Sequence, residues 1–149
     1  MKKITAIIFL VLSIIVITIP AFAFNVDVAN VCFSPHCGCT EAIINQIDDA
    51  KSEILIQAYS FTSTPIAKAL VNAHKRGVHV EIILDKSNRS KKYSAGDFTA
   101  HMGVTTYIDS KHAIAHNKIM IIDKETVITG SYLCGAPHKK LNAESIVMR

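Results

Sequence analysis

The stretch HNKIMIIDKETVITGS, from His116 to Ser131, combines the pattern of a buried strand with a spaced set of polar side chains. Its first part is short and rich in β-branched residues, and the polar residues 123–125 follow it, which predicts a buried strand and then a turn. Side chains alternate between the two faces of a strand, so His116 and Lys118 are expected on the same face, one repeat apart. A fixed ammonium can hold a phosphate oxyanion while a neighbouring imidazole attacks phosphorus or delivers a proton.

A lone His-x-Lys pair more often marks nothing beyond the exposed start of a strand. Here Asp123 completes the pattern H-x-K-x4-D, and Gly130 and Ser131 follow seven and eight residues after the aspartate. This larger set favours a phosphate-handling site, with His116, Lys118 and Asp123 as candidate catalytic residues.

The amino-terminal residues have the organisation of a secretory signal peptide. Lys2 and Lys3 precede an apolar run from Ile4 to Ile19, and Ala21-Phe22-Ala23 forms an A-x-A cleavage site. We therefore predict a signal peptide at residues 1–23, cleavage after Ala23, and a secreted or periplasmic protein of residues 24–149. An uncleaved anchor is the alternative, although the apolar run is short for a membrane span. Cleavage would lower the formal net charge from +4 to +2, because 14 basic and 12 acidic residues remain.

The 149 residues are enough for one domain with one hydrophobic core. Strands are expected at Val26–Phe33, Ile54–Tyr59, Val78–Leu84, Val104–Tyr107, Lys118–Ile122, Thr126–Thr129 and Ser145–Met148, and helices from Thr40 to about Lys51, from Thr64 to Gly77 and at Ala95–Met102. Thr40 and Thr64 are the expected N-caps of the first two helices. The repeated order of strand, helix and strand predicts a layered α/β/α domain with a mostly parallel or mixed sheet flanked by helices.

Four cysteines lie in the part of the chain that follows the predicted signal peptide: Cys32, Cys37, Cys39 and Cys134. An even number of cysteines in an exported chain favours disulfides. Three connectivities are open, and a Cys37–Cys39 bridge is disfavoured because it would close a strained ring. A metal site made by Cys32, His36, Cys37 and Cys39 is a less favoured alternative, since the spacing matches no known zinc pattern.

A basic stretch from Lys86 to Lys92 follows the third expected strand. Ligand sites in such sheets gather beyond the carboxyl ends of strands. The four positive charges could bind a nucleic acid backbone or make peripheral contact with an anionic membrane. A solvated loop explains the same charges equally well.

The stretch from His116 to Ser131 resembles the HKD motif of the phospholipase D superfamily. Three further segments resemble the small bacterial branch with a single HKD motif, which includes periplasmic endonucleases: EILIQAYSFTS (Glu53–Ser63), ALVNAHKRGVHVEIILD (Ala69–Asp85) and YIDSKHAIAHNKIMIID (Tyr107–Asp123). The resemblance covers nearly everything after the first thirty residues. It implies metal-independent hydrolysis of a phosphodiester, either nucleic acid or phospholipid, without a cofactor.

The resemblance also implies a role for each motif residue. His116 is the expected nucleophile, which forms a phosphohistidine, and Lys118 binds the nonbridging phosphate oxygens. Ser131, next to Gly130, adds a hydrogen bond, and Asp123 is expected to support the site more than to react. Glu144 matches the acidic residue that contacts and orients the histidine, which fixes the tautomer of the imidazole.

The leaving alkoxide needs a proton that a nucleophilic histidine cannot supply, so a second histidine is required. Relatives with one HKD motif work as homodimers that share one active site, and we expect the same here. Two features depart from the family: Leu133 replaces the asparagine of the usual Gly-Ser-x-Asn, and the chain stops at Arg149, where the endonucleases continue. They leave an alternative, a catalytically weakened protein that only binds anionic ligands such as nucleic acid or membranes.

Overall fold

The structure, a computed structural model, describes residues 28, 30–34, 38–89, 94–131 and 144–148. The strands are β1 (Asn30–Ser34), β2 (Glu53–Ala58), β3 (His79–Asp85), β4 (Thr105–Asp109), β5 (Lys118–Ile122), β6 (Thr126–Gly130) and β7 (Glu144–Met148). The helices are α2 (Cys39–Asp49), α3 (Thr64–Lys75) and α4 (Ala95–His101), with a short 3-10 helix, η1 (Lys86–Asn88), after β3. Each expected strand and helix is present, with its bounds shifted by a few residues at most.

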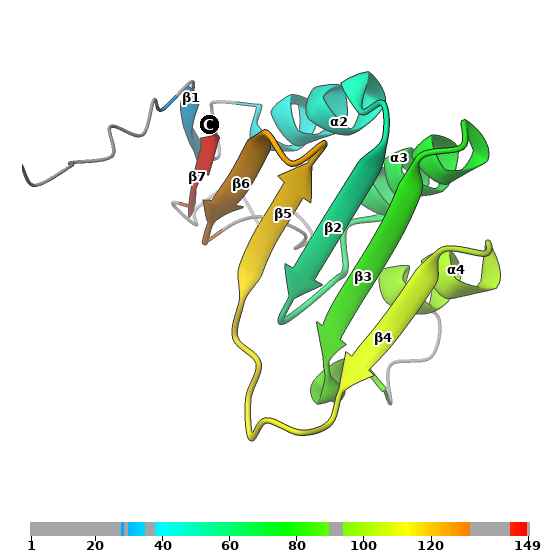
Figure 1. The fold of residues 1–149 in the computed structure, drawn as a ribbon. Helices are drawn as coiled ribbons and strands as arrows, with labels where there is room; N and C mark the ends of the chain where they lie inside the picture. The colour runs from blue at the N-terminus through cyan, green and yellow to red at the C-terminus, as the bar shows by residue number, and fades with distance from the viewer. Residues whose placement is uncertain (1–27, 29, 35–37, 90–93, 132–143, 149) are drawn as a thin grey trace, which may run out of the picture.

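The seven strands form one sheet in the order β1-β7-β6-β5-β2-β3-β4 (Figure 1). The β2–β3 and β3–β4 pairs are parallel, and the other four pairs are antiparallel. The predicted α/β domain with a mixed sheet and flanking helices is confirmed. The parallel strands β2, β3 and β4 are connected in succession by α3 and α4, whereas a tight turn joins the antiparallel strands β5 and β6.

The three described helices cover one face of the sheet, where they pack in the order α2, α3, α4 (Figure 1). Alternate residues of the central strands point to this face and are buried: Ile54, Ile56 and Ala58 from β2, and Val80, Ile82 and Leu84 from β3. Against them lie the apolar stripes of α2 and α3, including Ile43, Ile47, Ile66 and Leu70, each with no exposed surface. These stripes follow the helical period of about 3.6 residues.

The opposite face of the sheet carries the intervening strand residues. Leu55, Ile83, Ile119 and Ile121 line a shallow, mainly apolar hollow of about 250 Å3, together with Gln57 and Glu81. Ile119 is 36% exposed, and Tyr107, further along the same face, is 52% exposed. No helix among the described residues covers this face (Figure 1).

Both expected helix N-caps lie one or two residues away from the observed ones. Gly38 caps α2 with a left-handed backbone, φ 63°, and Ser63 caps α3, with Pro65 in its first turn. Thr40 and Thr64 are therefore helical residues, and the N-cap prediction was wrong in both cases. Glycine replaces a polar cap at α2 because the left-handed conformation costs it least.

The predicted signal peptide, Cys37 and Cys134 lie outside the described residues. Cys32, buried in β1, is disulfide-bonded, and its partner also lies outside them. No helix in the described part of the chain is both long and apolar enough to cross a membrane.

Candidate active site

Strand pairing gathers most of the predicted site residues at one edge of the sheet. Lys118 is the first residue of β5 and pairs with Ala58, the last residue of β2. Gly130 ends β6, which runs antiparallel to β5, and Glu144 begins β7, which runs antiparallel to β6. The start of β5, the end of β6 and the start of β7 therefore lie together.

The His116 and Lys118 side chains meet at this edge. The Lys118 Nζ lies 3.2 Å from the His116 Nε2. An ammonium has only donors, so this contact requires a lone pair on Nε2, the form of the ring that can attack phosphorus. The imidazole is exposed, and its ring centroid lies 4.5 Å from that of Tyr59. The expected pairing of these two side chains is confirmed, although β5 begins at Lys118 and His116 lies in the loop before it.

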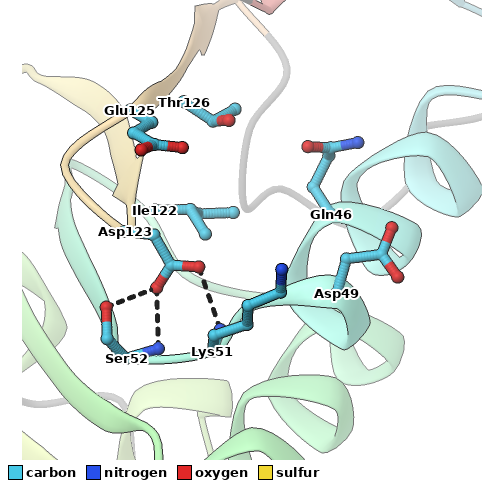
Figure 2. Close-up of a pocket in the computed structure, with 8 residues that line it drawn as sticks. All are labelled: Gln46, Asp49, Lys51, Ser52, Ile122, Asp123, Glu125 and Thr126. Atoms are coloured by element: carbon cyan, nitrogen blue, oxygen red, sulfur yellow. Dashed lines mark hydrogen bonds between the residues drawn. The ribbon is translucent and has the colours of Figure 1, made fainter.

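Asp123 lies at the opposite end of β5 from Lys118. Its carboxylate accepts hydrogen bonds from the backbone N–H groups of Lys51 and Ser52 and from the Ser52 hydroxyl, at 2.7–2.9 Å (Figure 2). It also accepts one from the backbone N–H of Glu53 at 3.0 Å. These donors, led by the Glu53 N–H, hold the pKa of the carboxyl far below its usual range. The structure therefore separates Asp123 from the His116–Lys118 pair and joins the β5–β6 turn to the segment between α2 and β2.

Asp123 also occupies the tight turn itself. Asp123 and Lys124 both have positive φ, 53° and 63°, and the Glu125 N–H donates to the Ile122 carbonyl at 3.0 Å. Asp123 and Lys124 are the central residues of a β-turn within the three-residue connection 123–125, and positive φ at both central positions favours aspartate, asparagine and glycine. The open hollow of about 610 Å3 around this turn contains neither His116 nor Lys118, so it is distinct from the candidate site (Figure 2).

Replacing Asp123 with asparagine should lower stability more than it lowers the turnover of the folded protein. Asparagine tolerates the turn but offers only one carbonyl oxygen, so a backbone N–H loses its charged acceptor at a cost of about 2 kcal/mol. The depressed pKa adds stability above the unfolded-state pKa of about 3.9, and this stability is lost as the pH falls through the folded-state pKa. Urea unfolding between pH 7 and pH 3 should therefore show a flatter acid dependence in the variant.

The control is Glu125→Gln, which neutralises an exposed carboxylate in the same turn. It should leave the unfolding curve close to that of the wild type. Equal losses from the two variants would show that the Asp123 hydrogen bonds add no specific stability.

The remaining motif residues are described only in part. Ser131 follows Gly130 at the site edge and is exposed. The backbone of Glu144 lies in β7 opposite Ser34, but the structure does not describe its side chain. Leu133 lies outside the described residues. Their expected roles toward His116 therefore stay predictions.

The basic stretch lies at the same edge as the His116–Lys118 pair. It begins with η1 at the carboxyl end of β3, where Lys86 and Arg89 are exposed, and Lys91 and Lys92 are outside the described residues. The Asp85 carboxylate just before η1 accepts a hydrogen bond from the Ala115 N–H, one residue ahead of His116, at 2.8 Å. This contact shows that the stretch borders the candidate site, as expected.

Three further residues lie at this edge that no sequence motif predicts as part of the site: Tyr59, Asp85 and Asn88. Asp85 and Asn88 are buried, with 3% and 5% of their surface exposed. The only sequence signal for Asp85 is a carboxylate directly after a buried apolar strand.

The chain is similar to known proteins in both sequence and fold. Residues 43–148 match the family model described as cardiolipin synthase, PLD-like domain. The chain is 45% identical, over 117 residues, to a protein named phospholipase D from Rickettsia conorii, which covers 78% of this chain and 58% of that protein. The chain thus spans somewhat more than half the length of such curated relatives.

Two solved structures have the same fold. Nuc from Salmonella typhimurium, described as a phospholipase D family member, superposes with a TM-score of 0.73 at 37% sequence identity, covering 80% of each chain. NucT from Helicobacter pylori superposes with a TM-score of 0.66 over 80% of this chain and 82% of its own, and at 24% identity it shows the fold alone.

Proposed function

The chain belongs to the phospholipase D superfamily, and on this premise we propose that it is an exported, metal-independent phosphodiester hydrolase that acts through a phosphohistidine. The observation that carries the proposal is the 3.2 Å contact between the Lys118 Nζ and the His116 Nε2. It places a cation and an available nitrogen lone pair side by side on an exposed edge.

In the proposed reaction, the phosphate displaces the ammonium from the imidazole. Lys118 then donates to a nonbridging oxygen, and the freed Nε2 of His116 attacks phosphorus. The bond from phosphorus to the leaving oxygen breaks, and that oxygen takes a proton from a general acid. Water then attacks the phosphohistidine, gives up a proton to the same group, and releases the phosphomonoester and the free imidazole.

We propose that the general acid is His116 of a second copy, in a homodimer that shares one active site. Among the described histidines, His112 and His101 are engaged with Asp109 and Asp97, with ring Nδ1 to carboxylate oxygen separations of 2.7 Å and 3.5 Å. Twofold symmetry would supply a second motif histidine without any further residue. The apolar sheet face around Ile119 and Tyr107 supports pairing with a second copy, because exposed apolar faces of this kind favour association.

We propose a phospholipid as the first substrate to test. Ile114, two residues before His116, is 67% exposed, and the cationic Lys86 and Arg89 lie at the same edge. An apolar side chain beside positive charges suits peripheral contact with an anionic membrane. The name of the Rickettsia relative agrees with this choice, and the Nuc likeness makes nucleic acid the second substrate.

The purified protein should hydrolyse phosphatidylcholine vesicles or plasmid DNA in the presence of excess chelator. Specific activity should fall when the protein is diluted through the dissociation constant of its dimer, which sedimentation measures independently. Loss of activity with chelator would contradict the metal-free mechanism. Binding to anionic vesicles or DNA without turnover would favour the alternative of a weakened protein, with Leu133 in place of asparagine as its cause.

A further inference from the structure

The backbone on both sides of His116 is held by the ends of β2 and β3. The loop of residues 110–117 forms neither helix nor strand, so regular secondary structure does not orient the imidazole. Instead, the Ala115 N–H donates to the Asp85 Oδ2 at 2.8 Å, and the Tyr59 N–H donates to the Asn117 carbonyl at 2.8 Å. The residue before His116 and the residue after it therefore each have a fixed anchor.

The two anchors are joined by a buried asparagine. The Asn88 Nδ2 donates to the carbonyl of Tyr59 at 2.7 Å and to the carbonyl of Asp85 at 3.0 Å. The Asp85 Oδ1 also accepts from the Ser87 N–H at 2.9 Å, which fixes the carboxylate at both oxygens. The accepted bonds, first from Ala115 and then from Ser87, lower the pKa of Asp85 to about 2, so the anchor stays ionised at neutral pH.

Tyr59 additionally contacts both side chains of the proposed chemistry. Its ring lies 4.5 Å from the His116 ring, centroid to centroid, at an interplanar angle of 52°. The Lys118 Nζ lies 5.7 Å from the centroid of the same ring, within the range of a cation–π contact. Tyr59 is half-buried, and its ring packs against the exposed imidazole of His116 and lies near the Lys118 ammonium.

We infer that Asp85, Asn88 and Tyr59 form a clamp that positions His116 for attack, with Asp85 fixing the backbone and the Tyr59 ring fixing the imidazole and Lys118. The inference rests on the proposed function, since it concerns the same reaction. Correct orientation of a reacting group supplies a large part of the rate enhancement of an enzyme, and a misplacement of about 1 Å can lower the rate roughly a hundredfold. None of the three residues transfers a proton or touches phosphorus in this scheme, so they are positioning residues.

The chain supplies a matched control for Asp85. Asp109 is its register partner at the carboxyl end of β4, and its carboxylate likewise accepts backbone N–H bonds, from Lys111 at 3.0 Å and His112 at 3.3 Å. It anchors the beginning of the loop and not the residues beside His116. Asp85→Asn and Asp109→Asn therefore make the same chemical change at neighbouring strand ends.

Asp85→Asn should lower kcat roughly ten- to a hundredfold with little change in KM, because an amide cannot accept from both N–H groups and the His116 backbone loses an anchor. Asp109→Asn should keep kcat near the wild-type value. Tyr59→Leu should also lower kcat, and Tyr59→Phe, which keeps the ring, should recover most of that loss. Equal effects of the two aspartate variants, or equal losses from Tyr59→Leu and Tyr59→Phe, would overturn the clamp.

A second readout does not depend on turnover. Nitrogen NMR of the folded protein reports the tautomer of the His116 imidazole, and proton NMR reports the ring-current shift that it receives from Tyr59. Both signals should change in Asp85→Asn and Tyr59→Leu and stay unchanged in Asp109→Asn. If the wild type hydrolyses nothing, the proposed function fails, while these signals still decide whether the clamp exists. Unchanged His116 signals in Asp85→Asn would overturn the clamp whatever the activity.

Discussion

His116→Asn should abolish phosphodiester hydrolysis. Asparagine keeps a polar side chain of similar reach beside Lys118 and Tyr59, but its amide nitrogen has no lone pair available for attack on phosphorus. The exposed position of His116 means that little packing is lost. The variant should therefore remain folded, with an unchanged circular dichroism spectrum and unfolding midpoint, and should show no product above the uncatalysed rate.

The control for this prediction is His112→Asn, four residues earlier on the same loop. His112 is exposed, and its ring nitrogen lies 2.7 Å from Asp109. The variant should retain most of the activity, because His112 takes no part in the proposed reaction. Substantial turnover by His116→Asn, or a covalent phosphoryl group that still forms on that chain, would show that another residue is the nucleophile.

Local sequence pattern predicts the elements of this fold well. β5 occupies Lys118–Ile122 as expected, and the stripe of Ile66 and Leu70 on α3 is buried as its spacing indicates. Pattern does not predict which strands become neighbours, because alternation reports only the face on which a side chain lies. β5 lies between β2 and β6, and this position depends on long-range packing. The alternation of strands and helices from β2 to β4 led to the expectation of a mostly parallel or mixed sheet; the sheet is mixed, and only the pairs within β2, β3 and β4 are parallel.

The same contrast between local pattern and long-range packing explains which site residues lie together and which do not. His116 and Lys118 are two residues apart, and local geometry alone brings them together. Asp123 belongs to the same motif, but a rise of about 3.3 Å per residue places its Cα roughly 16 Å from that of Lys118 along the strand. Motif membership favoured a catalytic role, whereas strand geometry places Asp123 where it accepts hydrogen bonds from Ser52 and Glu53.

Asp85 and Tyr59 could not be found from the sequence because their contacts with the loop that carries His116 join residues far apart in the chain. The Ala115 N–H and the Asp85 carboxylate are 30 residues apart in the chain, and no short motif joins them. Only the parallel pairing of β2 with β3, and the placement of β5 on the other side of β2, brings the three strand ends together. A motif can thus predict the candidate reacting residues, whereas the residues that we propose to position them come together only in the assembled sheet.

Lys118→Ala should lower kcat by roughly a hundredfold or more, because a preorganised donor aimed at a phosphate oxygen contributes that much when the transition state gains charge. Lys118 is half-buried at the start of β5, with its Nζ 3.2 Å from the His116 Nε2, so in the proposed reaction its charge acts at the phosphate without a metal ion. Its loss removes interactions that strengthen as the phosphoryl oxygens gain charge. The effect should therefore appear mainly in kcat, with a smaller rise in KM.

Lys124→Ala is the matched control at the opposite end of the same hairpin. Lys124 is exposed and its Nζ lies 3.8 Å from a carboxylate oxygen of Glu53, so its removal changes the net charge equally without touching the candidate site. Steady-state rates on vesicles and on DNA, measured at two salt concentrations, separate the two lysines: Lys118→Ala should lose turnover at both, and Lys124→Ala at neither. Equal rate losses from both would assign Lys118 to general electrostatic attraction of an anionic substrate, and the oxyanion role would be wrong.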